Sequence, residues 1–191
     1  MTWKNFLMIG VAAGALAVLP EATFAASNQT CASVKALRAG NDGSVLLDNL
    51  LMDAHNASVE TEDLESMLHS TSVSWETHAA ALNRLRDDVN NMGEDLCRLE
   101  AIRATAPVWQ QKAIDGTAAP LRLMADNLQD AVAFLNNHRD DLWMAQYGNY
   151  IHNLSTESAR ITHSVRGYEN YARVHQKDEN LAHTLGVAAG D

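Results

Sequence analysis

Two histidines carry the clearest potential for chemistry in this chain of 191 residues. His78 and His138 fall at apolar positions of a helical repeat, so both side chains are expected to point inward. If two antiparallel helices turn near residue 106, these histidines reach the same level, together with Met67 and Met144. Imidazole and thioether groups that converge inside a bundle would hold haem or a soft transition metal. Histidines near helix ends also reach water or a carbonyl group, so a purely structural role is the simpler interpretation.

No other arrangement of reactive residues matches a catalytic pattern. No histidine follows a glutamate by three residues, as a di-metal carboxylate centre in a bundle requires. The nucleophile elbow, the phosphate-binding glycine loop and the zinc protease motif are also absent from the sequence. Asp53 and Glu60 adjoin an apolar stripe, and we expect Ala54 and Thr61 to lie inside with both acids at the rim. The sequence therefore predicts a non-enzymatic protein without a resident cofactor.

The two cysteines, Cys31 and Cys97, predict a disulfide bond if the protein is exported. Cys97 adjoins the apolar seam of its helix, where a segment outside the bundle could reach it. Two unpaired buried thiols are the alternative.

The first 25 residues have the pattern of a cleavable export signal. Lys4 precedes an apolar run from Phe6 to Leu19, and Thr23-Phe24-Ala25 supplies small residues at the positions that a signal peptidase reads. The run is short for a bilayer-spanning helix, which needs roughly 20 apolar residues. We therefore expect a periplasmic or secreted protein that contacts the membrane only through the signal before cleavage. An uncleaved anchor is the alternative.

The formal charge of −10 disfavours binding to nucleic acid or to anionic membrane surfaces, because phosphates would repel the chain. An aromatic set could instead form a binding surface for a partner protein, although aromatic residues at helical spacing are usually part of a core. Its members are Trp109, Trp143, Tyr147, Tyr150, Tyr168 and Tyr171.

Four helices must position these side chains. Apolar residues recur at steps of three and four, as in the series Trp75, His78, Leu82, Leu85, Val89, Met92, Leu96 and Leu99. The repeats predict helices at about 44–69, 75–104 and 107–139, and a fourth after Asp141. We expect a helix stop at 40–43 and a kink or break at 115–120, where Gly116 and Pro120 occur.

This pattern predicts an all-α fold, an antiparallel up-down-up-down four-helix bundle with a short N-terminal helix packed outside. The expected organisation is a signal peptide at 1–25, a segment with the short helix at 26–43, the bundle at 44–178 and a frayed tail at 179–191.

Two segments resemble a family of uncharacterised exported bacterial helical-bundle proteins. The segments are Trp75-Glu76-Thr77-His78-Ala79 and Trp109-Gln110-Gln111-Lys112-Ala113-Ile114-Asp115. The resemblance implies a secreted bundle and no known activity, so it assigns no functional residue. We expect a non-enzymatic protein that binds an envelope protein or itself, and the alternative is a periplasmic haem or metal carrier.

Overall fold

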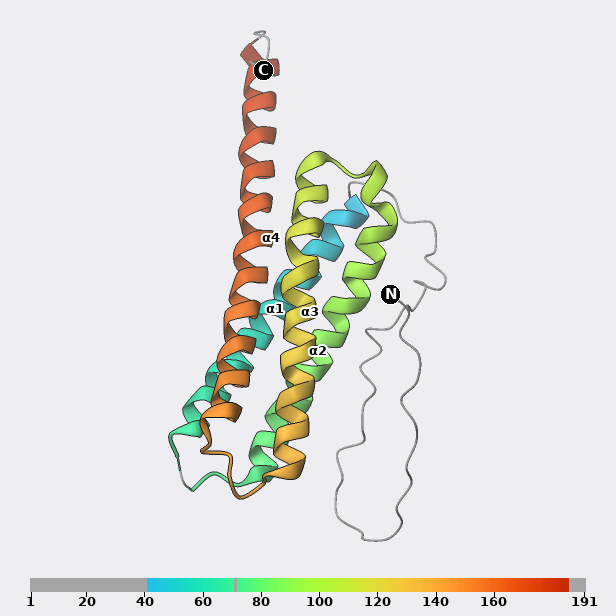
Figure 1. The fold of residues 1–191 in the computed structure, drawn as a ribbon. Helices are drawn as coiled ribbons and strands as arrows, with labels where there is room; N and C mark the ends of the chain where they lie inside the picture. The colour runs from blue at the N-terminus through green and yellow to red at the C-terminus, as the bar shows by residue number, and fades with distance from the viewer. Residues whose placement is uncertain (1–40, 71, 186–191) are drawn as a thin grey trace.

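The computed structural model describes residues 41–70 and 72–185. The described chain forms α1 (Asn41–Leu68), α2 (Trp75–Ile102), a short 3-10 helix η1 (Arg103–Thr105), α3 (Val108–Asn137) and α4 (Ala145–Leu185), without a strand. α1 packs against α2 and α4, and α3 packs against the same two helices (Figure 1). These contacts confirm the predicted all-α helical bundle.

Side-chain contacts show which helix ends lie together. At the lower end in Figure 1, the Arg139 guanidinium lies 4.2 Å from the Trp75 ring centroid, and His78 contacts Tyr147. At the upper end, the Gln110 amide donates a hydrogen bond of 3.1 Å to the Ser44 hydroxyl. The start of α2 therefore lies beside the α3–α4 junction, and the start of α1 lies beside the start of α3.

The core contains the predicted apolar seams. Buried side chains of α2 follow the expected series from His78 to Leu99, while Trp75 is half-buried. Ala54 and Thr61 are fully buried, and Asp53 and Glu60 lie at the rim, as expected. The largest fully buried side chains come from all four helices: Leu47, Leu50, Leu64, Leu82, Leu85, Met92, Leu99, Ile114, Met124, Leu128, Leu135 and Tyr147.

The predicted helix stop is not observed at residues 41–43, and neither is a break at 115–120; the kink that was the alternative to this break stays a prediction. α1 begins at Asn41, so residues 41–43 belong to a helix rather than to the expected stop. Gly43 packs closely there, since a Cβ on it would lie 2.7 Å from Gln110 Oε1. α3 also continues through Pro120 without a break, because buried residues on both sides, Thr117 and Leu121, keep the segment against the core.

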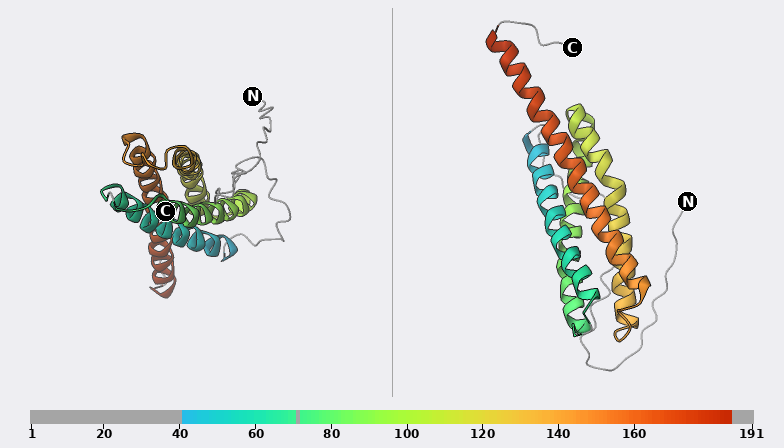
Figure 2. Two further views of the ribbon diagram at one scale, coloured as in Figure 1. Left: turned by 90° about the horizontal axis from the view of Figure 1, so that it is seen from below. Right: turned by 90° about the vertical axis from the view of Figure 1, so that its left-hand side faces the viewer.

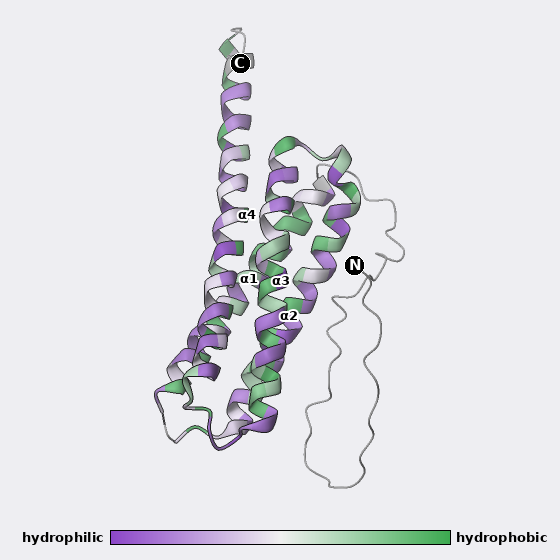
Figure 3. Ribbon diagram, viewed as in Figure 1, coloured by the Kyte–Doolittle hydropathy of each residue, from purple (hydrophilic) through white to green (hydrophobic). Residues whose placement is uncertain are grey.

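The last part of α4 gradually leaves the bundle. Val165 is the last buried residue of the described chain, but the helix continues to Leu185, beyond the expected end at residue 178. We call residues 166–185 the α4 extension. In Figures 1 and 2 the outer part of the extension projects past the ends of the other helices, and Figure 3 shows apolar residues along its otherwise hydrophilic length.

Within the described residues, no helix has both the length and the apolar character that crossing a bilayer requires.

Candidate functional site

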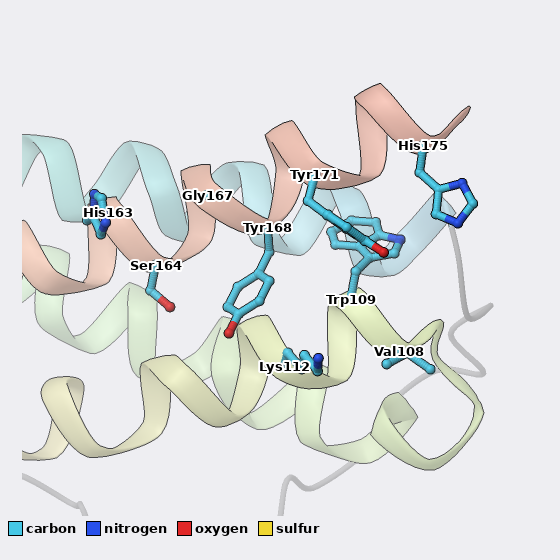
Figure 4. A pocket seen from close by; sticks show the side chains of 9 residues that line it. All are labelled: Val108, Trp109, Lys112, His163, Ser164, Gly167, Tyr168, Tyr171 and His175. Atoms are coloured by element: carbon cyan, nitrogen blue, oxygen red, sulfur yellow. The ribbon is translucent and has the colours of Figure 1, made fainter. Parts of the chain in front are cut away.

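An open groove lies between the start of α3 and the upper half of α4 (Figure 4). Its volume is about 650 Å³. The residues that line it are Val108, Trp109 and Lys112 from α3 and His163, Ser164, Gly167, Tyr168, Tyr171 and His175 from α4. The groove therefore includes three members of the aromatic set that the sequence indicated.

Close packing at one end and separation at the other create the groove. A Cβ on Gly116 would lie 2.6 Å from the Ser164 hydroxyl oxygen and 3.9 Å from Cε2 of Tyr168, so α3 and α4 are in close contact there. One turn further along α4, a Cβ on Gly167 would meet no atom within 4 Å. The two helices thus separate toward the upper end, and aromatic side chains only partly fill the space.

The groove presents apolar surface to solvent. Val108 is 68% exposed and Tyr171 is 60% exposed, while Trp109 and Tyr168 are half-buried. In Figure 4 Tyr168 points from α4 toward the start of α3. Partly covered apolar side chains lose unfavourable contact with water when another surface covers them. The groove is therefore suited to bind an apolar surface.

Polar groups surround this apolar lining. Lys112 and His163 are exposed, and Nδ1 of His175 lies 3.7 Å from the Glu179 carboxylate. The His175 ring also packs edge-on against the Tyr171 ring, at 5.9 Å between centroids and 85° between planes. The groove margin thus carries the cationic side chain of Lys112, two histidines and a carboxylate beside one of them.

Glu169 lies on the α4 extension and interacts with Asp48 of α1. Burial and the neighbouring Asp48 of α1 raise the pKa of Glu169 to about 7, although Arg173 and Arg166 act in the opposite direction.

His78 and His138, the histidines of the alternative haem or metal site, lie in different surroundings. His78 is buried, and its Nδ1 lies 3.3 Å from the Tyr147 hydroxyl. His138 is exposed and stacks on Phe134 at 4.3 Å, and Phe134 in turn stacks on Tyr147 at 5.7 Å. The rings thus form a series of contacts in which Tyr147 and Phe134 connect the two histidines.

The inward position predicted for His138 is wrong. α3 ends at Asn137, so His138 has left the helical repeat that would direct it inward, and its φ is −138°. Met67 is half-buried and Met144 is 38% exposed. Burial also lowers the pKa of His78, so this imidazole is neutral at pH 7. In the described part of the chain, no three histidine, cysteine or acidic side chains are grouped as metal ligands.

An acidic cleft lies between α1 and α2, with a volume of about 370 Å³. Its lining residues are Asn56, Val59, Glu60, Arg84, Asp87 and Asp88. The Arg84 guanidinium donates two hydrogen bonds to the Glu60 carboxylate, at 2.7 and 2.8 Å. Burial, followed by repulsion from Asp53, Glu60 and Asp87, raises the pKa of Asp88 to about 6.

The predicted disulfide involves a residue outside the described part of the chain. Cys97 lies on α2 and is half-buried, whereas Cys31 precedes the first described residue. The pairing of Cys31 with Cys97 therefore stays a prediction, as do the short helix within 26–43 and the signal peptide.

Only part of the groove is evident from the sequence. Trp109, Tyr168 and Tyr171 were indicated by their type, but His163, His175 and Val108 were not. Of the other aromatic residues, Tyr147 is fully buried, whereas Trp143 is exposed and lies outside the groove. The helical spacing of Tyr171, Val174, Leu181 and Leu185 could have identified this surface. These residues continue a helical repeat beyond Val165, where the buried seam of α4 ends.

Comparisons with protein-family models, with curated proteins and with solved structures found no match to this chain.

Proposed function

We propose that this protein is a non-enzymatic binding protein that acts by associating with another protein, or with itself, through the α3–α4 groove and the adjoining α4 extension. The observation that carries this proposal is the set of exposed apolar side chains on these two elements. Val108 and Tyr171 lie at the groove, and Val174, Leu181 and Leu185 are 58%, 57% and 65% exposed along the extension.

We place the binding surface on the outside of the bundle, because packed side chains fill its interior. Some large apolar side chains are exposed in the free protein and become covered in a complex. Each of them contributes about 25 cal/mol to the free energy of binding per Å² of apolar area removed from water. Several such residues on one surface therefore supply a driving force that an isolated exposed leucine does not.

We also propose the cellular location and the helix topology that the sequence predicts. The partner is an envelope protein or a second copy, since residues 1–25 have the pattern of an export signal. The bundle is of the up-down-up-down type, with a short helix from the 26–43 segment against its outside. Membership of the family of exported bacterial bundle proteins belongs to the same proposal.

The test is a binding experiment with matched variants. Val174→Lys/Leu181→Lys places two charges on the extension, and Met52→Lys/Leu123→Lys places the same charges on exposed apolar positions elsewhere. Light scattering after size exclusion, and capture from envelope extract with mass spectrometry, should show association for the wild type and the control only. A wild-type protein that is monomeric and captures no partner would contradict the proposal.

A further inference from the structure

The two parts of the binding surface have complementary shapes. The groove is a concave region at residues 163–175 of α4, and the end of the extension presents Leu181 and Leu185 as convex apolar groups. Both parts belong to one helix, so every copy of the chain carries one concave part and one convex part. A pair of copies related by a twofold axis could then fill both grooves at once, as in an isologous interface.

The spacing of the exposed residues fits pairing of two helices. Tyr171, Val174, Leu181 and Leu185 are separated by three, seven and four residues, which places them along one seam of a helix. Asp178 occupies the remaining position of this seam and makes it partly polar. The extension is about 30 Å long at 1.5 Å per residue, so it can reach across a second extension to the groove at its base.

The charges favour an antiparallel arrangement. The first part of the extension, residues 166–177, has three cations and one carboxylate and a net charge of +2, from Arg166, Arg173, Lys177 and Glu169. The second part, residues 178–185, has a net charge of −2 from Asp178 and Glu179. Antiparallel pairing places each basic part over the acidic part of the other copy, whereas parallel pairing places like charges together.

The distribution of charge along the whole chain also favours antiparallel pairing. The extension is neutral, so the net charge of −10 resides in the remainder of the chain. Antiparallel pairing keeps the two acidic bundles at opposite ends of the paired helices, whereas parallel pairing would bring them side by side. Repulsion between the bundles therefore also disfavours the parallel arrangement.

We infer that two copies of this chain associate through antiparallel α4 extensions, with Leu181 and Leu185 of each copy seated in the α3–α4 groove of the other. This inference rests on the proposed function and names the partner as a second copy.

The first test measures mass and affinity. Light scattering should give a dimer for the wild type and for Met52→Lys/Leu123→Lys, and a monomer for Val174→Lys/Leu181→Lys. The dimer dissociation constant should rise with added salt, because salt screens the attraction between the basic and acidic parts. A wild-type monomer at every concentration, or a dimer strengthened by salt, would overturn the inference.

The second test determines orientation. A photoreactive amino acid at position 185, in a mixture of isotopically light and heavy protein, should cross-link to residues 108–112 or 163–175 of the other copy. Cross-links confined to residues 181–185 of the other copy would refute the antiparallel arrangement. If the protein is monomeric but captures another protein that the Val174→Lys/Leu181→Lys variant loses, the second copy is refuted while the proposed function survives.

Discussion

Asp88→Asn should stabilise the folded protein at neutral pH and have little effect in acid. In the folded state Asp88 is partly buried and faces Asp53, Glu60 and Asp87, which together raise its pKa from 3.8 to about 6. The Arg84 guanidinium nearby is already hydrogen-bonded to Glu60. Asparagine keeps the shape of the side chain and removes the charge that this environment disfavours.

The magnitude follows from the change in pKa. A rise from 3.8 to about 6 corresponds to about 3 kcal/mol for a fully buried group. Solvent around this partly exposed carboxyl screens the repulsion, so we expect about 1 kcal/mol. Below pH 3.8 the carboxyl is protonated in the folded and unfolded states, and the gain from Asp88→Asn vanishes. Above about pH 6 it is ionised in both states, and the gain is complete.

Urea unfolding followed by circular dichroism, at about pH 4 and about pH 7.5, measures this difference. The control is Asp87→Asn, because the Asp87 side chain is 70% exposed and its replacement should change stability by less than about 0.5 kcal/mol. An Asp88→Asn protein that is less stable than the wild type at neutral pH, or that gains equally at both pH values, would refute the reasoning.

Three further substitutions test the packing of the helices by urea unfolding. Gly93→Ala should stabilise the protein by about 0.5–1 kcal/mol, because its Cβ would meet no atom within 4 Å and alanine favours a helix; a loss of stability would show that the site is not open. Gly116→Ala should stabilise the protein less than Gly93→Ala does, because its Cβ would lie 2.6 Å from the Ser164 hydroxyl oxygen, and moving that hydroxyl offsets part of the gain in helix propensity; adding Ser164→Ala should recover the full gain, and a double variant no more stable than Gly116→Ala would contradict this. Tyr147→Phe should cost about 1–2 kcal/mol, because buried Nδ1 of His78 loses its hydroxyl partner; an unchanged stability would exclude a contribution from this hydrogen bond.

The interior of the bundle was predictable because apolar spacing alone determines which face of a helix is buried. The series from His78 to Leu99 in α2 is buried as expected. The same rule placed Ala54 and Thr61 inside α1. It failed for His138, since a repeat directs a side chain only while the backbone remains helical, and α3 ends one residue earlier.

The groove was less predictable because it depends on the distance between two helices. The close contact of Gly116 with Ser164, followed by separation of α3 from α4, leaves Trp109 and Tyr168 only partly covered. Periodicity within one helix carries no information about such a separation. Similarly, Pro120 indicated a break, but packing of its neighbours Thr117 and Leu121 kept α3 continuous.

The length of α4 gives one helix two different modes of amide hydrogen exchange. Backbone amides between Tyr147 and Val165 are covered by the core, so their exchange requires the whole bundle to open. Amides from Arg173 onward are protected only by the hydrogen bonds of an isolated helical segment, which is marginally stable in water. Exchange along this continuous helix should therefore accelerate steeply after the last buried turn, and trypsin should cleave first at Arg173 or Lys177 whenever the extension is uncovered.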